Sequence, residues 1–506
     1  MSNSERIRYG NLSAPGMQGL FGMPLPVFGA ALIGLTLTLF LLVSAPWWIG
    51  IIAGVLCAVL IAPAAIRVNH GRTLYERMGL AIAGWHARRT GVNRLVAGPA
   101  GRTVDGSFRL PGIATQSEVK DYQTGFGLKF ALVSIPSTDH HSVVLEVHPT
   151  GAELVDQHLI DSQVAQWAAW LTLLGQEDDI AGASVTVETS VDSGLRLRRS
   201  VLTPVDESSS DFGKAVASEV AGGFGARTPA ISTRVTLTFS GRSEGKSRSR
   251  AEMAEEIANR LPELMDGLGS TGAGAHVRPS TSQDLTDYVR VAYDPTVAAD
   301  VELARAGEGT GLSWSDAGPA FHQVEFDHYL HDRAVSSVWT LGGVPRGVFY
   351  DTSLKRLLSP DPAVARKRVT MLYRPIPAVR TSSIVDRKER NANMVSGAGR
   401  TNRSHNSAAQ RAAQRTADEE AAGAGLTLFG MIVTATAVSG SGDVSRARVE
   451  DLRAARQAIR SQSAKARLKM RPALNSSDSA FVAGLPLGIV LPEHTRIPAS
   501  VTDGLV

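Results

Sequence analysis

Val27–Ser44 (VFGAALIGLTLTLFLLVS) and Trp48–Ile66 (WIGIIAGVLCAVLIAPAAI) are two apolar runs that contain no charged residue. Each is about 18–19 residues long, enough to cross the hydrocarbon core of a bilayer as a helix. Pro46 and Trp47 lie between the runs, and aromatic side chains suit the lipid–water interface. A secretory signal peptide is the alternative for the first run, but that run is long and a second follows directly. We therefore predict a transmembrane helical hairpin over residues 27–66.

Positive charge flanks both ends of this hairpin, whereas the short loop between the runs carries none. Arg6 and Arg8 precede it, and the following stretch contains Arg67, Arg72, Arg77, Arg88, Arg89 and Arg94. Basic residues stay on the cytoplasmic side of a membrane. The expected localisation is the cytoplasmic membrane, with two passes and with both termini and all soluble domains in the cytoplasm.

The rest of the chain has the composition of a globular protein. Of 506 residues, 43% are hydrophobic and 20% are charged, and more than one soluble domain is expected after the hairpin. The net charge of +4 is too small to indicate nucleic-acid binding by itself. The single cysteine, Cys57, lies in the second apolar run, which excludes an intramolecular disulfide and a cysteine-based metal site.

The predicted domain order follows shifts in composition along the chain. Thr73–Arg89 has helical spacing, and its arginines suit lipid phosphates, although a simple stop-transfer flank is an equal alternative. The divisions are an N-terminal cytoplasmic tail (1–26), the hairpin (27–66), a juxtamembrane helix and linker (67–106), a first α+β unit (107–306), a second α+β unit (307–490) with a polar helical arm (381–425), and a tail (491–506).

Hydrophobic periodicity predicts the main elements of both units. In the first unit these are a hairpin of Leu128–Ile135 and Ser142–Val147, strands Val185–Val191, Ser232–Phe239 and His276–Arg278, and helices Gln157–Leu174, Ser249–Leu264 and Ser282–Val289. Ser208–Gly225 is expected to be a loop with a short helix. In the second unit they are strands Gln323–Phe326, Val335–Leu341, Val369–Tyr373, Leu426–Ala437 and Arg467–Arg471, and helices Ser445–Ser461 and Ser477–Val482.

The two units share an internal parallel. Each contains a strand, a Gly/Ser loop, a helix and a strand that ends in a similar motif, His276–Pro279 in the first and Lys469–Pro472 in the second. Doubled strand–helix–strand units predict two ferredoxin-like α/β sandwiches. Chance similarity of such short segments is the alternative.

A glycine-rich loop over Gly241–Ser247 resembles a phosphate-binding loop but has three residues between its glycines, not the four that such a loop needs. We interpret it as an ordinary polar loop. Asp327, His328, His331 and Asp332 are candidate metal ligands on a helix, but the alternation from His322 to His328 favours a strand with a polar end. No catalytic, cofactor-binding or metal-binding residue is therefore predicted.

Two other polar stretches are candidate sites. His140 and His141 are expected at an exposed hairpin tip beside Asp139. The segment 446–471 is strongly basic, which suits DNA or an acidic partner, although a solvated helix face is the simpler interpretation.

Several diffuse motifs carry a family resemblance between about residues 25 and 490. They are Gly71–Tyr75 (GRTLY), Leu110–Ile113 (LPGI), Tyr293–Pro295 (YDP), Leu426–Gly430 (LTLFG) and Ala483–Leu487 (AGLPL). With the hairpin, they make the chain resemble actinobacterial conjugation and type IV secretion proteins. These carry a PrgI-like membrane hairpin ahead of a VirB-type traffic-ATPase N-terminal region that lacks the motor. The resemblance implies that the motor is a separate polypeptide, and it supplies no catalytic residue.

The expected function is a non-enzymatic membrane scaffold that docks a separate VirB-type motor ATPase for DNA or protein transfer. Its expected partners are that motor, other secretion or conjugation subunits and the bilayer, with no cofactor. The alternatives are a membrane subunit of a type VII secretion core and a membrane-tethered metal- or nucleotide-dependent enzyme.

Overall fold

The computed structural model describes most of the chain outside its termini. The described residues are 25–68, 72–99, 101, 103, 105–151, 155–203, 205, 208–223, 228–243, 246–274, 276–343, 349–377, 381, 426–438 and 444–495. The predicted arm (381–425) lies outside them except for Thr381, as does most of each predicted tail.

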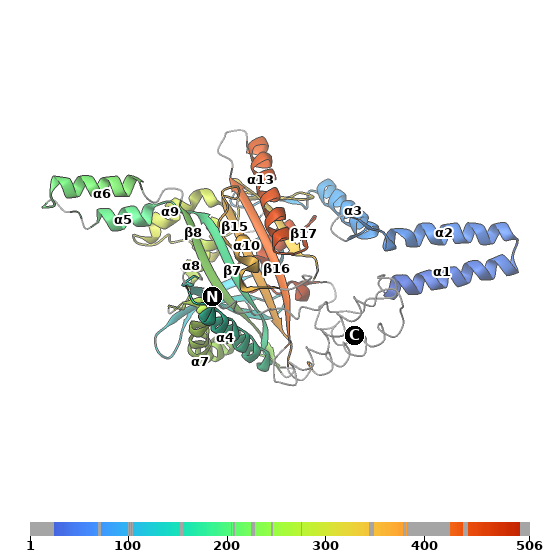
Figure 1. Cartoon of the computed structure of the whole chain (residues 1–506), viewed down its shortest axis with the longest axis horizontal. Coiled ribbons are helices and arrows are strands. Elements are labelled where there is room, and N and C mark those ends of the chain that lie inside the picture. The colour runs from blue at the N-terminus through green and yellow to red at the C-terminus, as the bar shows by residue number, and fades with distance from the viewer. Residues whose placement is uncertain are drawn as a thin grey trace, which may run out of the picture.

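Two apolar helices, α1 (Leu25–Ser44) and α2 (Trp47–Ala65), lie side by side and project from the rest of the molecule (Figure 1). We call this pair the apolar hairpin. Helix α3 (Leu74–Thr90) follows and lies between α2 and the body. Thr73 begins α3 as its N-cap, and Thr73 and Glu76 form a reciprocal capping box that satisfies two free amides of the first turn.

The body is built on one 13-stranded antiparallel sheet. In chain order its strands are β3 (Arg94–Val96), β4 (Glu118–Gln123), β5 (Lys129–Ile135), β6 (His140–Val147), β7 (Ile180–Val191), β8 (Pro229–Ser240), β11 (Arg278–Pro279), β12 (Phe321–Val324), β13 (Tyr329–His331), β14 (Ala334–Leu341), β15 (Arg366–Pro375), β16 (Thr427–Val438) and β17 (Met470–Pro472). The main path is β3-β12-β13-β14-β16-β15-β7-β8-β6-β5-β4. The predicted combination of an apolar helix pair with an α+β body is confirmed.

Two similar halves meet edge to edge in this sheet. The first half pairs in the order β11-β6-β8-β7, and the second in the order β17-β14-β16-β15. Strands β7 and β15 join the halves, with Val185 opposite Met371 and Glu188 opposite Arg368. One continuous sheet therefore runs through both predicted units.

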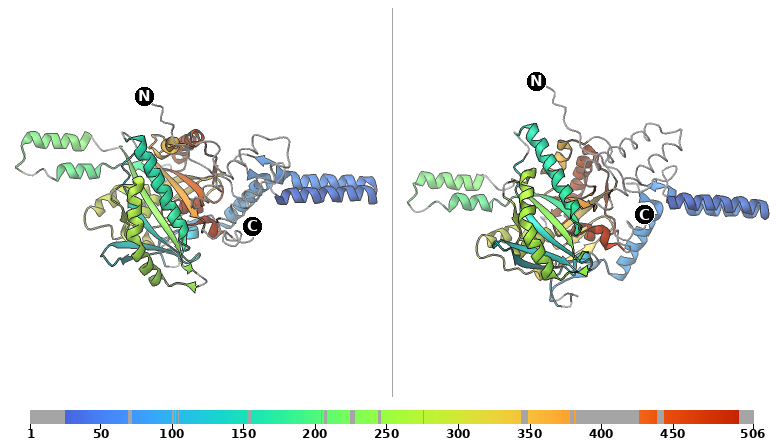
Figure 2. Two further views of the ribbon diagram at one scale, coloured as in Figure 1. Left: turned by 60° about the horizontal axis from the view of Figure 1, so that its bottom comes forward. Right: turned by 90° about the horizontal axis from the view of Figure 1, so that it is seen from below.

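Helices cover both faces of the sheet (Figure 2). On one face, α4 (Gln157–Gln176) and α7 (Arg250–Leu268) pack on the first half, and α13 (Val444–Lys465) packs on the second. On the other face, α8 (Ser282–Tyr293) and α14 (Ser477–Ala483) share a core around Tyr293 and Phe481. In each half a helix follows the short last strand onto this second face, which matches the internal parallel in the sequence.

Of the remaining helices, α9 (Ala298–Arg305) and α10 (Lys355–Leu358) are short, and Leu357 of α10 is buried in the core beneath α13. Helices α5 (Leu195–Leu202) and α6 (Asp211–Gly223) project from the end of the body opposite the apolar hairpin (Figure 1). The prediction of a loop with a short helix over Ser208–Gly225 was wrong, since α6 occupies thirteen residues of that range.

Helix α8 begins after Thr281, which is its N-cap, and Asp284 completes a capping box with it. One face of β7 carries polar side chains, yet Thr186 and Glu188 on that face are buried. Helix α8 covers this face, where the Tyr288 hydroxyl binds Glu188 and buried arginines oppose its charge.

Candidate functional site

Small residues bring the two helices of the apolar hairpin into close contact. A Cβ atom added to Gly50 would lie 2.5 Å from the Leu42 Cγ, and one added to Gly54 would lie 3.0 Å from the Thr38 methyl. The hydroxyl of Thr38 donates to the Gly34 carbonyl at 2.8 Å, which satisfies the donor inside the helix. Close packing of small residues with internally bonded hydroxyls is typical of helix pairs surrounded by apolar groups.

The outward surface of the hairpin is apolar and exposed. Its exposed large side chains include Leu32, Ile33, Leu35, Leu39, Phe40, Val43, Ile52, Val55, Leu56, Val59 and Leu60. Within the described residues, one helical window, Trp47–Ala64, is long and apolar enough to cross a membrane, and Gly29–Ser44 is a shorter apolar segment. A core helix or a signal sequence satisfies the same criteria, but only 6% of the Trp47–Ala64 window is buried.

Direct contacts hold α3 and Arg72, which lies just before it, against the C-terminal half. The Asn475 side-chain amide donates to the Leu80 carbonyl. Gly84 of α3 is buried against Asn475, so closely that an added Cβ would overlap this side chain. Asn475 has φ of +52°, a left-handed conformation that asparagine tolerates better than most residues. Arg72 donates to the Pro472 carbonyl at 3.0 Å. We call these contacts the α3 clamp.

The same helix is tied to the apolar hairpin. The Tyr75 hydroxyl donates to the Leu60 carbonyl at 2.6 Å, which connects the first turn of α3 to the last turns of α2. The α3 clamp and this bond together link the hairpin to strand β17, on the edge of the second half.

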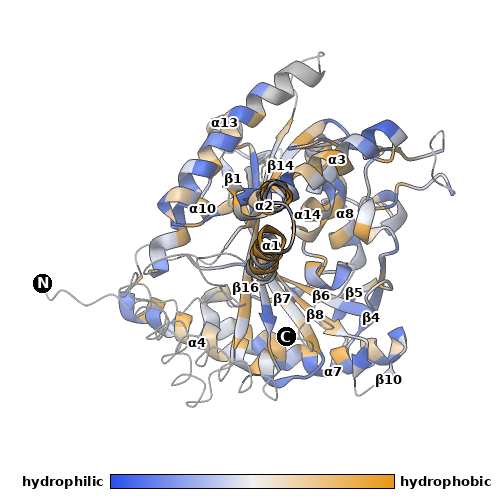
Figure 3. Cartoon of the chain, turned by 90° about the vertical axis from the view of Figure 1, so that its right-hand side faces the viewer, coloured by the Kyte–Doolittle hydropathy of each residue, from blue (hydrophilic) through white to orange (hydrophobic). Residues whose placement is uncertain are grey.

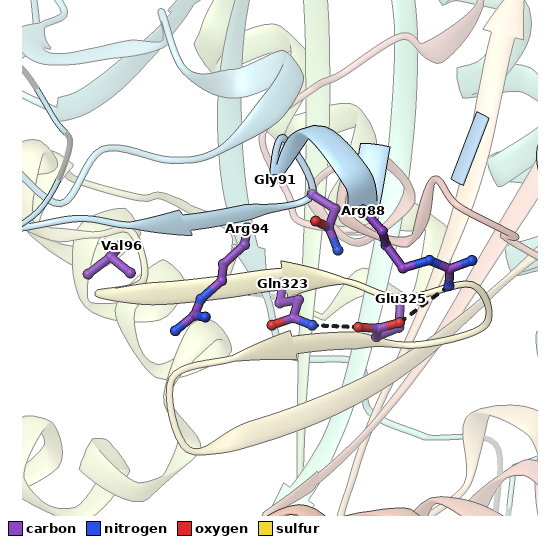
Figure 4. Close-up of a pocket in the computed structure, with 7 residues that line it drawn as sticks. Arg88, Gly91, Arg94, Val96, Gln323 and Glu325 are labelled. Atoms are coloured by element: carbon purple, nitrogen blue, oxygen red, sulfur yellow. Dashed lines mark hydrogen bonds and ion pairs between the residues drawn. The ribbon is translucent and has the colours of Figure 1, made fainter. Parts of the chain in front are cut away.

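An open cavity of about 520 Å³ lies at the other end of α3 (Figure 4). Arg88 and Gly91 from the end of α3, Asn93, Arg94 and Val96, and Gln323 and Glu325 from the β12 hairpin line it. Arg88 and Glu325 form an ion pair of 3.7 Å, and Gln323 also donates to Glu325. Neither a nucleophile–base pair nor a set of metal ligands is present among these lining residues.

The glycine-rich segment Gly241–Ser247 is a small β-hairpin in its described residues, with Lys246 paired to Ser243. Asp139 binds it, accepting from the Ser247 hydroxyl at 3.1 Å and from the Gly241 amide at 2.7 Å. The α7 N-terminus behind it is closed by a capping box of Ser249 and Glu252. These bonds occupy the Gly241 amide, the Ser247 hydroxyl and the amides of Ser249 and Glu252.

The predicted His/carboxylate cluster is separated by a turn. Strand β12 ends at Val324 and β13 begins at Tyr329, so the prediction of one strand from His322 to His328 was wrong. His331 is fully buried and binds the Tyr293 carbonyl at 2.5 Å and the Ser336 hydroxyl at 2.8 Å. Among the described residues, no group of three or more His, Cys, Asp or Glu side chains is placed to hold a metal ion.

Asp327 and Asp332 instead have separate structural partners. Asp327 pairs with His328 at 2.8 Å and Arg456 at 2.7 Å, and the hydrogen bond from His328 and the charge of Arg456 lower its pKa to about 2. Asp332 accepts from Arg290 at 2.7 Å and from the Phe321 amide at 3.0 Å.

His140 and His141 were predicted to be exposed, and this was wrong, since only 5% and 6% of their surfaces are accessible. Strand β8 pairs with β6 as far as His140, so the exposed tip is confined to the preceding residues. His141 binds the Ser134 hydroxyl at 3.0 Å. Burial lowers the pKa of His140 to about 4.

In its described part, the basic segment 446–471 contains one internally bonded arginine and several exposed basic residues. Arg456 is engaged internally, bonding to Ser337 at 2.7 Å and to Asp327. The exposed basic residues are Arg453, Arg460, Lys465, Arg467 and Lys469. This pattern is that of a packed helix with a solvated outer face.

Sequence reasoning missed a charged network at the junction of the two halves. Glu188 of β7 accepts from Arg366 at 2.5 Å, from Arg368 at 2.9 Å and from the Tyr288 hydroxyl at 3.0 Å. Burial alone would raise the pKa of Glu188, but the two arginines lower it to about 2. The Arg234 guanidinium lies 4.1 Å from the Tyr288 ring centre and binds Glu146 at 2.9 Å. The network closes the interface between the halves and has no free acid–base group.

One comparison with known protein families gives a match. A model described as a domain of unknown function (DUF8461) matches residues 17–76. This region contains the apolar hairpin and the first residues of α3, well under half of the chain. No curated protein matches the sequence.

Proposed function

We propose that this chain is a non-enzymatic scaffold subunit of the cytoplasmic membrane. In this proposal the apolar hairpin crosses the bilayer twice and holds the body in the cytoplasm. The body then docks a separate motor ATPase of a conjugative or type IV secretion apparatus. The observation that carries the anchoring step is the exposed apolar surface of α1 and α2, which projects clear of the body (Figure 1).

The free energy of transferring apolar side chains out of water favours a bilayer around this hairpin. Removing a large apolar side chain from water gains roughly 1.5–3 kcal/mol, and many such side chains are exposed here on adjoining turns. A hairpin of this size left in water would drive aggregation. Backbone groups are satisfied within each helix, as hydrocarbon requires.

The α3 clamp supports a scaffold role because it fixes the hairpin relative to the sheet. Tyr75 bonds to α2, while Leu80 and Gly84 contact Asn475 of the C-terminal half. The position of the hairpin in the membrane thereby fixes the position of the sheet, which a flexible tether would not do.

We further propose that each half of the sheet is a ferredoxin-like sandwich. The order β11-β6-β8-β7 corresponds to 4-1-3-2 in a βαββαβ unit, and β17-β14-β16-β15 repeats that order with β14 as the first strand. All pairs are antiparallel in both halves. Two such units joined by their second strands offer an extended surface for a protein partner.

The motor partner rests on the family resemblance, which implies a VirB-type ATPase on a separate polypeptide. The non-enzymatic role is supported by the internal bonding of the candidate groups, from the Gly241 hairpin to Asp327 and Asp332.

A topology experiment tests the anchoring step. Green fluorescent protein and alkaline phosphatase are fused in turn after Val506, and each is inserted at Pro46 in a matched pair of full-length fusions. We expect fluorescence without phosphatase activity at Val506 and the reverse at Pro46. Phosphatase activity at Val506, or fluorescence at both sites in the soluble fraction, would contradict the two-pass arrangement.

A further inference from the structure

Helix α3 has one face that contacts the body and an opposite face whose side chains are exposed, with Tyr75 at its start bonded to α2. Leu80 and Gly84, which meet Asn475, define the contact face. With about 100° of rotation per residue, the opposite face is formed by four exposed side chains and Arg89. The four are Tyr75 (43% exposed), Met78 (53%), Ile82 (62%) and Trp85 (55%). We call these four the α3 stripe.

The stripe has the composition of a surface that meets a lipid boundary. Tyrosine and tryptophan lie at its two ends, and aliphatic side chains lie between them. Arg89 extends the stripe, with its guanidinium carbon 5.2 Å from the Trp85 ring centre. The pair combines an apolar ring with a positive charge held against it, which suits the headgroup region of a bilayer.

Charge around the stripe is strongly positive. Five arginines and one acidic residue occur between positions 72 and 94. The acidic residue is Glu76, whose carboxylate is bound to the Thr73 amide in the capping box. Arg89 is exposed on the side of the stripe, so it is free to meet an anionic surface without breaking a described ion pair.

The position of α3 makes the stripe continuous with the apolar hairpin. Tyr75 bonds to Leu60 in α2, so the stripe begins where the hairpin ends. Viewed along the hairpin, α3 lies on the face of the body from which α1 and α2 project (Figure 3).

We propose that the α3 stripe inserts into the headgroup–acyl boundary of an anionic phospholipid bilayer, with Arg89 on a lipid phosphate. This inference rests on the proposed membrane anchoring and deepens it. The α3 helix then acts as a third, interfacial contact that sets the tilt of the body against the membrane. Of the possible occupants of an apolar helix face, the bilayer is favoured by the continuity with α2 and by the basic surround.

Site-directed spin labelling of the full chain tests the proposal. Cysteines are introduced one at a time at Val59, Ile82 and Ala83 in a Cys57→Ala background, and the labelled proteins are reconstituted in phosphatidylcholine vesicles containing phosphatidylglycerol. Val59 reports the span, Ile82 the stripe, and Ala83 an exposed position off the stripe on the same helix. Accessibility to oxygen and to a water-soluble nickel complex is compared at each label.

We expect the labels at 59 and 82 to favour oxygen over nickel and the label at 83 to favour nickel. A lipid-like signal at 59 with a water-like or fully shielded signal at 82 would overturn the stripe proposal and leave the anchor intact. A water-like signal at 59 would instead overturn the anchor itself, and the stripe proposal with it.

The role of charge is tested with a matched pair of single variants. R89Q removes the arginine beside the stripe, and R460Q removes an exposed arginine from α13. We expect the immersion of label 82 to increase when phosphatidylglycerol is added to phosphatidylcholine, and R89Q to weaken that increase while R460Q keeps it. An equal response of both variants would contradict phosphate contact by Arg89.

Discussion

Glu188 of β7 and Arg368 of β15 lie directly opposite each other where the two halves of the sheet meet, and the carboxylate and guanidinium are 2.9 Å apart. Both side chains are buried, with 4% and 3% of their surfaces accessible. Arg366 binds the second carboxylate oxygen, so one acid holds two cations at the junction. The halves are therefore joined by charge as well as by the β7–β15 ladder.

Removing this acid should destabilise the whole body. Glu188→Gln would leave Arg366 and Arg368 buried without a counter-charge, and breaking a buried pair in this way costs about 3–5 kcal/mol. Thermal unfolding of detergent-solubilised protein, followed by tryptophan fluorescence, measures the effect. Asp105→Asn is the matched control, because its pair with Arg109 is exposed and should contribute less than about 1 kcal/mol. Equal melting temperatures for the two variants would argue against the junction role.

Acid should weaken the fold through two buried histidines. Burial lowers the pKa of both His140 and His322 to about 4, from an ordinary value of 6.5. As the pH falls through 6.5, the unfolded chain takes up these protons and the folded chain does not. The free energy of unfolding therefore decreases between about pH 6.5 and pH 4, on the order of 1–3 kcal/mol per ring.

Replacing either histidine should reduce the pH dependence of the free energy of unfolding, whatever the substitution does to absolute stability. His140→Asn and His322→Asn are compared with His158→Asn, an exposed position on α4. The slope of melting temperature against pH is the measurement. A slope that all three variants share with the parent would rule out these rings as the source.

The α3 clamp should depend on Gly84 and not on Gly79, a second glycine in the same helix. Gly84→Ala would place a methyl group against Asn475, whereas a Cβ at Gly79 meets nothing within 4 Å. We expect Gly84→Ala to loosen α3 from the body and Gly79→Ala to stabilise the helix by up to about 1 kcal/mol. Spin–spin distances between a label at Ala83 and one at exposed Lys469 report the attachment. Unchanged, narrow distance distributions in Gly84→Ala would contradict the clamp.

Long periodic segments were predicted well because packing on one face imposes their pattern. The predicted helix Gln157–Leu174 corresponds to α4, and the predicted strand Val335–Leu341 to β14. Strand β4 was missed because EVKDYQ is a polar edge strand that pairs with only one neighbour and lacks a buried run. Local hydrophobic periodicity does not reveal a polar edge strand, even one that pairs with its neighbour in sequence.

The junction network escaped prediction for a related reason. Charged residues on alternating strand positions ordinarily indicate a solvated face, and Glu188 follows that pattern. Only the pairing of β7 with β15 brings Arg366 and Arg368 to it, across about 180 residues of chain. The α3 clamp likewise joins Leu80 to Asn475, which are 395 residues apart. By contrast, the repeat that ends in Arg278–Pro279 and Arg471–Pro472 was visible in the sequence, and both motifs pair with the first strand of their half.

The most direct test of the scaffold proposal is purification of the full-length protein from its native host in mild detergent, followed by mass spectrometry of the proteins that remain bound. We predict that a VirB-like motor ATPase accompanies it, and that the ATPase is retained by the parent and by Gly79→Ala. Recovery of a type VII secretion ATPase instead, or of no motor at all, would contradict the proposed function.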